Sequence, residues 1–364
     1  MKKQILACAV AAAFATAASA ADVSVYGVVD TGLNYGHSKV TGSSSSNTFK
    51  MDSGISAPSR WGLQGSEDLG NGYSVSFNLQ SGFDVDTGRL GYDNRIFGRE
   101  ARLTIAGPVG ELSFGRMGSL ASSAGTYDIF MGYADIYDGG WGTANGAIGG
   151  MNFFYDRSRC DNMVTYATPT VAGFKGYAQY SFKVDANGTG TEGKNSSKRY
   201  AGVGVTYENG PLAAVVVFDS ILNPTADAVA KKDGRAVSVG GSYDFGAAKV
   251  FVAYQYGKNE NFAGGVSAYD EGTQVKGHNF HVGASVPVCA GTLSAGVYYT
   301  TVESISDSDK TVKTYDVAAT YVYPLSKRTS VYAGVGYAQI KNKLSGAEVK
   351  TKAFDAAAGL TYAF

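Results

Sequence analysis

The sequence predicts an all-β protein, a sixteen-stranded antiparallel β-barrel that spans a membrane. Apolar and polar residues alternate with a period of two along many segments, as in strands with one apolar face. Short turns and long polar connections also alternate along the chain. Glycine and tyrosine are abundant, at 49 and 25 residues, whereas proline is scarce at 7 and only 17% of residues are charged.

The first twenty residues have the pattern of an export signal. Two lysines precede a short apolar run, and small residues typical of a cleavage site end at Ala20. We therefore expect residues 1–20 to be removed and residues 21–364 to form the barrel. The apolar run is too short to cross a bilayer as a helix, which takes about 20 apolar residues.

The charge balance excludes some classes of partner. Removal of the signal lowers Lys+Arg from 31 to 29 against 31 acidic residues, so the net charge is about −2. A nucleic-acid partner calls for a basic patch and is not expected. No later stretch holds 18 consecutive apolar residues, which excludes a helical membrane protein.

Strand patterns run from the mature N-terminus to the last residue. In residues 73–80, Tyr, Val, Phe and Leu occupy one face, and Ser, Asn and Gln the other. Residues 293–300 and 315–323 repeat the pattern, and residues 356–364 form a last amphipathic strand. We expect the apolar faces to meet lipid and the polar faces to enclose water.

The connections give the topology. Short turns are predicted at 69–72, 106–110, 169–173, 209–211, 245–248, 288–291 and 324–328. Long loops are predicted near 37–55, 84–93, 118–158, 184–198, 221–234, 257–276, 302–312 and 341–350. The seven turns and eight loops alternate without exception, so they join sixteen strands in an up-and-down order.

Two architectures hold such a meander. A soluble sandwich would not sort its connections by length to opposite ends. A transmembrane barrel does, with short turns on the periplasmic side and long loops outside. The barrel has to close, because an open edge in lipid leaves backbone groups unpaired. Sixteen strands leave a lumen wide enough for water.

The longest stretch without alternation covers residues 118–158. Connections of this length are usually functional or disordered, and this one is rich in aromatic residues, which disfavours disorder. It also carries Asp128, Asp135 and Asp138. We expect this constriction loop to fold into the mouth of the barrel; the alternative is an external flap with no role in the pore.

Motifs along the whole mature chain resemble those of the Gram-negative general diffusion porins, β-proteobacterial branch. They are Val-Tyr-Gly-Val-Val-Asp at 25–30, Ser-Arg-Trp-Gly-Leu-Gln-Gly-Ser-Glu-Asp-Leu-Gly at 59–70, Gly-Arg-Glu-Ala-Arg-Leu at 98–103, Gly-Glu-Leu-Ser-Phe-Gly-Arg at 110–116 and Asp-Asn-Met-Val-Thr-Tyr-Ala-Thr-Pro at 161–169. The resemblance implies an outer-membrane channel for passive diffusion of small hydrophilic solutes and ions, narrowed by its third outer loop.

The resemblance also implies that arginines on the barrel wall face this loop. The matching positions are Arg60, Arg99 and Arg159. Alternation places Arg60 and Arg159 in the lumen, but it puts Arg99 on an apolar face. Either a bulge resets the register of that strand, or this part of the wall does not face lipid, as at a trimer contact. Arg95 and Arg157 are secondary candidates.

Arginine suits such a wall because its planar group stays charged. Arginines opposite Asp128, Asp135 and Asp138 would set a transverse field across a narrow gap. The wall arginines outnumber these aspartates, which favours a weak preference for anions. The alternative is that the charges pair and only fasten the loop to the wall.

Assembly and partners follow from the same resemblance. It implies a homotrimer in contact with outer-membrane lipid and lipopolysaccharide. It also implies that the barrel assembly machinery reads a C-terminal signal that includes Tyr362 and Phe364.

Other functions find less support. The sequence shows no catalytic set and no cofactor or metal site, since His278 and His281 lie on opposite faces of one strand. Cys160 and Cys289 are not expected to pair. A substrate-selective channel for sugars or dicarboxylates stays open, because the constriction loop is rich in tyrosine, and so does an adhesin that binds through its outer loops.

Overall fold

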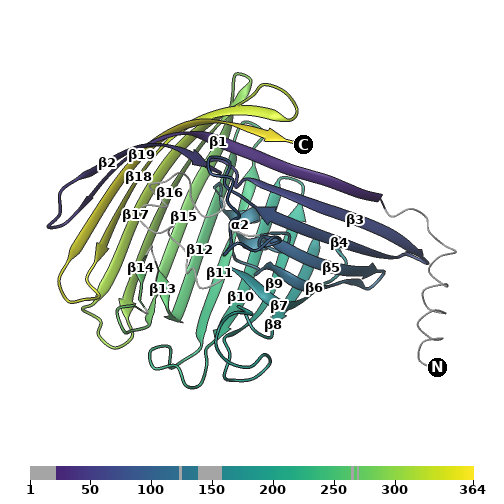
Figure 1. Ribbon diagram of the computed structural model, residues 1–364, viewed down its shortest axis with the longest axis horizontal. Coiled ribbons are helices and arrows are strands. Elements are labelled where there is room, and N and C mark those ends of the chain that lie inside the picture. Colours follow the sequence, from purple (N-terminus) through teal and green to yellow (C-terminus); the bar gives the residue numbers. More distant parts are fainter. Residues whose placement is uncertain (1–21, 123–124, 138–157, 264–265, 269) are drawn as a thin grey trace.

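Antiparallel strands make up most of the computed structural model (Figure 1). The structure describes residues 22–122, 125–137, 158–263, 266–268 and 270–364. The strands before the helix are β1 (Asp22–Val40), β2 (Ser46–Ser53), β3 (Arg60–Gly70), β4 (Tyr73–Gly82), β5 (Glu100–Gly107) and β6 (Gly110–Gly118), and the helix is α2 (Ile129–Ala134). The later strands are β7 (Arg159–Ala167), β8 (Phe174–Ser181), β9 (Arg199–Asn209), β10 (Leu212–Leu222), β11 (Gly234–Asp244), β12 (Lys249–Glu260), β13 (Phe262–Ala263), β14 (Val266–Ser267), β15 (Val275–Val288), β16 (Gly291–Ser304), β17 (Thr311–Pro324), β18 (Thr329–Asn342) and β19 (Val349–Ala363).

The sheet closes on itself between its first and last strands. β1 pairs with β19 from Val28 opposite Ala363 onward, and its other edge pairs with β2 and β3. β2 and β3 are two parts of one barrel strand, separated at residues 54–59. The seventeen segments that the described chain contributes to this sheet therefore form sixteen barrel strands, as predicted, while β13 and β14 form a separate hairpin.

The predicted turns are confirmed, and two predicted loops need correction. All seven short turns join neighbouring strands. Residues 37–55 are mostly strand, because β1 continues to Val40 and β2 begins at Ser46. The predicted loop at 257–276 is likewise shortened by β12 and contains β13 and β14. Beyond the apolar band both faces of a strand meet water, so pairing continues without the alternation from which strands are recognised.

The barrel has its apolar residues outside and its polar residues inside. Along β10, Val216 and Phe218 are 48% and 47% exposed, whereas Val217 and Asp219 are each 1% exposed. Buried polar side chains of other strands include Asp30, Asn34, Thr104, Ser113, Thr165, Gln179, Asn279 and Asp355. This arrangement excludes the soluble sandwich and fits a barrel whose outer surface faces lipid.

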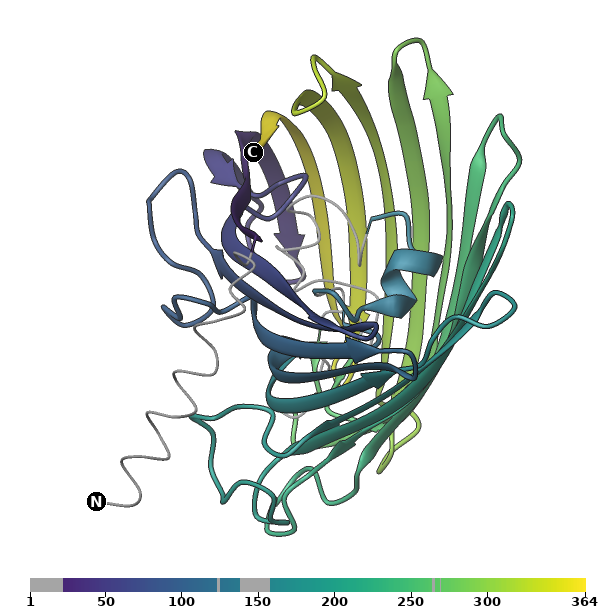
Figure 2. The same ribbon diagram turned by 90° about the vertical axis from the view of Figure 1, so that its right-hand side faces the viewer.

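Helix α2 packs on the inner wall of the barrel, where Figure 2 shows it beside the strands. Its contacts are with β10, β11 and β12, and its core includes Phe130 and Met131. The close approach depends on glycine, since a Cβ on Gly240 would lie 2.5 Å from that of Ala134. Among the described residues, no helix is long and apolar enough to cross a membrane.

Candidate functional site

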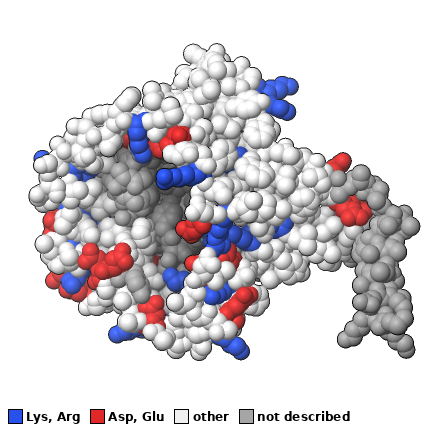
Figure 3. Space-filling model, in the orientation of Figure 1, with Lys and Arg blue, Asp and Glu red and all other residues white. Residues whose placement is uncertain are grey.

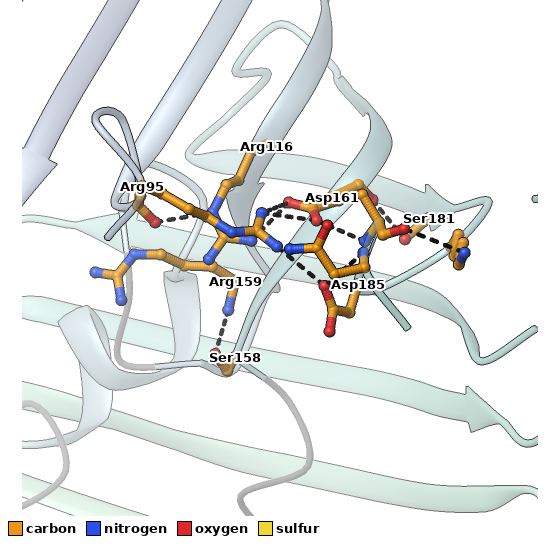
Figure 4. Close-up of polar contacts among 11 residues, drawn as sticks. Arg95, Arg116, Ser158, Arg159, Asp161, Ser181 and Asp185 are labelled. Carbon is orange, nitrogen blue, oxygen red and sulfur yellow. Dashed lines mark hydrogen bonds and ion pairs between the residues drawn. The ribbon is translucent and has the colours of Figure 1, made fainter. Parts of the chain in front are cut away.

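An arginine cluster lies where the loop before β5 meets β6 and β7 (Figure 4). Arg95 Nη1 donates to both oxygens of Asp161, at 2.7 and 2.8 Å, and its Nη2 lies 2.9 Å from Asp185 Oδ1. Arg116 Nη1 donates to Asp161 Oδ1 at 2.6 Å. The hydrogen bond to Asp161 raises the pKa of Arg95, so this pair stays ionised.

A β-bulge explains why Arg116 reaches this cluster. Gly115 has a φ of +133°, and the pairing of β6 with β7 shifts register between Gly115 and Met117. Strict alternation along β6 would place Arg116 on the lipid face with Phe114. Arg116 was not among the predicted site residues. Gly115 beside it was the one signal in the sequence for the bulge that turns this side chain inward.

Two further arginines stack on one tyrosine. The guanidinium carbon of Arg159 lies 4.7 Å from the ring centroid of Tyr92, and that of Arg99 lies 5.8 Å from it. Arg99 also donates to Gln80 Oε1 at 2.7 Å and to the Tyr92 hydroxyl at 2.8 Å. No carboxylate of the described chain lies within ion-pair distance of Arg99 or Arg159. Figure 4 shows the Arg159 guanidinium pointing away from Asp161.

The structure resolves the conflict over Arg99. This residue precedes β5, so the alternation of that strand does not fix its direction, and its side chain joins Gln80 on the polar face. Arg60 opens β3 and donates to the Pro58 carbonyl at 2.8 Å. Arg60 lies on the same strand face as Gln64, and its place in the pore stays a prediction.

A hydrogen-bonded chain links the wall to the start of the constriction loop. Glu100 accepts from Arg102, which donates to Thr104, and Thr104 contacts Ser113. Ser113 lies 2.6 Å from the Tyr127 hydroxyl, and burial raises the pKa of Tyr127. Arg102 and Glu100 lie on the inner face of β5, yet they were not among the predicted site residues.

The predicted loop aspartates form contacts within the protein. Asp128 caps α2 by accepting from Met131 N at 3.3 Å. The side chain of Asp135 is 0% exposed, and it accepts from the Tyr298 hydroxyl at 2.6 Å and lies 3.4 Å from His281 Nε2. This arrangement resembles the alternative in which loop charges fasten the loop to the wall.

Nearby Tyr137 bridges the same loop to another strand. Its hydroxyl donates to the Ser294 carbonyl of β16 at 2.7 Å. Burial raises the pKa of Tyr137 to about 12. The hydrogen bond therefore persists at every pH at which the Tyr137 hydroxyl is neutral.

The described residues include no candidate site for a metal ion or for redox chemistry. No group of three or more His, Cys, Asp or Glu residues in the described ranges is arranged to hold a metal ion. Cys160 is buried and Cys289 is exposed. His278 contacts Tyr254 on the outer face, whereas His281 faces Asp135 inside, as the alternation predicted.

Sequence comparison gives the family. A model of the Gram-negative porin family matches residues 7–343. The chain belongs to the Gram-negative porins. An outer membrane porin protein of Bordetella pertussis is 32% identical, with 93% of this chain and 94% of the relative covered.

Solved porin structures share the fold. The anion-selective porin from Comamonas acidovorans superposes with a TM-score of 0.68 at 23% identity, covering 94% of this chain and 100% of the other. The trimer form of OmpT from Vibrio cholerae, folded in vitro, has a TM-score of 0.62 at 19% identity, covering 95% of this chain and 100% of the other. The family and the Bordetella relative place the porin in the bacterial outer membrane.

Some predicted residues of this porin lie at its ends or outside the described ranges. Asp138 and Arg157 lie outside them, as do the signal segment and residues 138–157 of the constriction loop. Tyr362 and Phe364 stack with ring centroids 6.4 Å apart and are 43% and 42% exposed on the outer face. Phe364 also pairs through its backbone with Gly27 of β1, at 3.1 Å in both directions.

Proposed function

We propose that this porin is a passive channel for small hydrophilic solutes and ions, with a preference for anions set by its arginine wall. The wall consists of Arg60, Arg95, Arg99, Arg102, Arg116 and Arg159. Figure 3 looks onto a hollow in the molecule with basic and acidic side chains around it. A pore needs no reaction, because its width and the charges that line it set which solutes pass.

The exposure of the ion pairs is the observation that carries this proposal. Arg95 is 23% exposed and its partner Asp161 is 7% exposed. Arg116 is 16% exposed against the same Asp161, and Arg102 is 13% exposed against 3% for Glu100. In these three pairs the cation is more exposed than the anion, whereas Asp185, the second partner of Arg95, is 57% exposed. Because the six arginines of the wall outnumber Asp161, Asp185 and Glu100, the carboxylates that pair with them, a solute beside the wall meets mainly positive charge.

Two inward-facing carboxylates on other strands are buried. Asp316 of β17 and Asp355 of β19 face inward, but they are 6% and 0% exposed. Arg95, Arg102 and Arg116 have side chains that are 23%, 13% and 16% exposed, whereas Arg99, at 8%, is about as buried as Asp316. The anion-selective porin with the similar fold is consistent with this sign, although its preference belongs to that protein.

The tyrosines of the loop weaken the substrate-selective alternative. Tyr127 contacts Ser113, Tyr133 contacts Glu208 and Tyr137 contacts Ser294. Each hydroxyl is therefore bound to the wall. Such rings hold the loop in place and do not form a ladder along the path of a sugar.

Reversal potentials test the proposal. Purified porin is inserted in a planar bilayer with a tenfold KCl gradient, about 1.4 kcal/mol across the membrane. The double variant Arg60→Gln, Arg159→Gln should shift the reversal potential toward that of a cation-preferring pore. The matched control is Lys249→Gln with Arg328→Gln, two cations near the turn end of the barrel. An unchanged potential in the arginine variant would reject the pore role of these residues.

We also propose a homotrimer whose assembly depends on the C-terminal Tyr362 and Phe364. The trimer form of the structurally similar OmpT supports the oligomeric state. The exposed rings and the backbone hydrogen bonds between Phe364 and Gly27 support a role for the chain end in recognition by the assembly machinery. Deletion of Phe364 should lower the amount of folded trimer in outer membranes without changing synthesis. Normal trimer levels would contradict the role.

A further inference from the structure

The ring of Tyr92 is a partner that two wall arginines share. The guanidinium carbon of Arg159 lies 4.7 Å from its centroid, and that of Arg99 lies 5.8 Å from it. Arg99 also donates to the Tyr92 hydroxyl at 2.8 Å. The attraction between a cation and an aromatic ring brings no charge of the opposite sign to the site. The ring therefore holds two positive charges in one place and neutralises neither.

Two glycines provide the space in which the Tyr92 ring lies. A Cβ atom on Gly98 would overlap the Cβ of Tyr92, and one on Gly82 would lie 2.6 Å from its Cε2. The Gly82 carbonyl also accepts from the backbone nitrogen of Gly91, at 2.9 Å. Neither position has room for a methyl group while the ring stays where it is, so both glycines are needed for this placement.

The backbone that carries Tyr92 is strained. Tyr92, Asp93 and Asn94 have φ angles of +55°, +59° and +58°. Asparagine and aspartate adopt this left-handed conformation more readily than tyrosine does. Three such residues in a row persist only where the surrounding contacts hold them, and backbone strain of this kind gathers at functional sites. The unfavourable turn directs the ring at the arginines.

Carboxylates that would neutralise the two arginines lie close in the chain. Glu100 follows Arg99 directly, and Asp161 is the second residue after Arg159. Both carboxylates pair with other arginines of the wall. Figure 4 shows the Arg159 guanidinium pointing away from Asp161. Without the ring, either guanidinium would be free to turn toward these carboxylates, which would cancel part of its charge.

We infer that Tyr92 is a positioning residue that sets part of the ion preference of the pore, although it carries no charge. It acts through Arg99 and Arg159, whose guanidinium groups it holds near each other and away from carboxylates. This inference rests on the anion preference proposed above. It assigns part of that preference to a neutral side chain, which a sum of charges along the wall does not include.

A purely structural role of Tyr92 gives a different expectation. In that case the ring would only fix the loop before β5, and its loss would change the stability of the barrel or the width of the pore. Width and lining charge both govern passage through a channel, and they are measured separately. Conductance reports the width, whereas the ratio of chloride to potassium permeability reports the charge.

Exchange of Tyr92 for other neutral residues tests the inference. Tyr92→Leu removes both the aromatic ring and the hydroxyl, whereas Tyr92→Phe keeps the ring. The matched control is Tyr137→Leu, which removes a tyrosine that binds the wall without an arginine partner. Reversal potentials in a KCl gradient across planar bilayers give the permeability ratio, and the same recordings give the conductance. Migration of unheated samples on gels verifies that each variant is folded.

Tyr92→Leu should lower the chloride-to-potassium ratio by about twofold, the factor that a cation–π contact at an exposed site gives. Tyr92→Phe should keep most of the wild-type ratio, because the ring remains beneath the arginines. Tyr137→Leu should leave the ratio unchanged. A wild-type ratio in Tyr92→Leu, or equal losses in the Leu and Phe variants, would overturn the role of the ring.

The glycine beside the ring gives a second variant, in which Tyr92 itself is retained. Gly98→Ala places a methyl group where Tyr92 lies, so the ring should be displaced and the ratio should fall as in Tyr92→Leu. The matched control is Gly132→Ala in helix α2, where a Cβ would meet nothing within 4 Å. A folded Gly98→Ala porin with the wild-type ratio would contradict the inference.

A double-mutant cycle separates this inference from the proposed function. Tyr92→Leu should have no further effect on the ratio in an Arg99→Gln, Arg159→Gln background, because it acts through those arginines; a further loss there would overturn the positioning role. A wild type without anion preference would reject the proposed function, while the change caused by Tyr92→Leu would still test the inference. A preference that is lost in the arginine variant but kept in Tyr92→Leu would reject the inference alone.

Discussion

The arginine wall and the constriction loop carry opposite charges, and their charged side chains differ in the contacts that they make. Arg99 and Arg159 rest on the ring of Tyr92, with no carboxylate of the described chain in ion-pair distance. Asp128 caps a helix, and Asp135 is buried against Tyr298. The two signs therefore contribute unequally, because the loop carboxylates are held by hydrogen bonds within the protein, whereas these two arginines have no carboxylate of the described chain within ion-pair distance.

This difference gives the two sets of residues separable roles. Loss of a loop aspartate should affect chiefly the stability of the loop, whereas loss of a wall arginine should affect chiefly the ions that pass. Substitutions in each set, measured for both properties, test that separation.

The largest effect is expected at the anchor of the loop. Asp135→Ala removes the acceptor of the Tyr298 hydroxyl in a fully buried place, which should lower the free energy of unfolding by about 1–3 kcal/mol. Thermal unfolding in detergent measures it. Asp135→Asn, which keeps an acceptor oxygen, is the control and should lose less. The ratio of anion to cation permeability should change little in either variant, and a large change would contradict the division of roles.

The next effect concerns the arginines on Tyr92. The double variant Arg99→Gln, Arg159→Gln should lower the ratio of chloride to potassium permeability by about fivefold, the factor that 1 kcal/mol gives. Bi-ionic and gradient potentials in planar bilayers measure this ratio. A matched pair of outward-facing cations, Lys313→Gln and Lys341→Gln, should leave it unchanged. Equal effects of the two double variants would show that only net charge matters.

The tyrosine bridge of the loop gives a prediction with a pH dependence. Tyr137→Phe loses the hydrogen bond to the Ser294 carbonyl, which should destabilise the folded barrel by about 0.5–1.5 kcal/mol. Because the pKa of Tyr137 is raised to about 12 in the folded state, the neutral hydroxyl contributes fully below pH 10 and is lost as pH passes 12. Unfolding of wild type and variant compared at pH 8 and above pH 12 should show the difference only at pH 8. A difference that persists at high pH would exclude this bridge as its source.

The smallest effect is expected for an arginine with a carboxylate partner. Arg116 pairs with Asp161, which also binds Arg95. Arg116→Gln should change the chloride-to-potassium ratio by less than about twofold, since its charge is partly balanced by the carboxylate beside it. A shift as large as that of the Arg99 and Arg159 variant would mean that pairing does not screen the wall.

Alternation in the sequence predicted the barrel well, because each strand must present one face to lipid. It placed His278 and His281 on opposite faces of their strand, where the backbone is regular. It failed beside irregular backbone: the bulge at Gly115 turns Arg116 inward, and Arg99 lies just before its strand.

Contacts between the loop and the wall were beyond sequence reasoning. Asp135 meets Tyr298 across 163 positions, and Tyr137 meets Ser294 across 157. No local pattern marks such partners, because they depend on how the closed barrel receives the loop. The stacking of two arginines on Tyr92 also depends on residues 92–94, whose left-handed backbone conformation the sequence did not reveal.

A single-channel recording of the unmodified porin in asymmetric KCl tests the central claim most directly. A wall in which arginines outnumber the carboxylates that pair with them should bring the reversal potential toward the equilibrium potential of chloride. A reversal potential toward that of potassium would contradict this account, because it would mean that carboxylates control the ions in the pore.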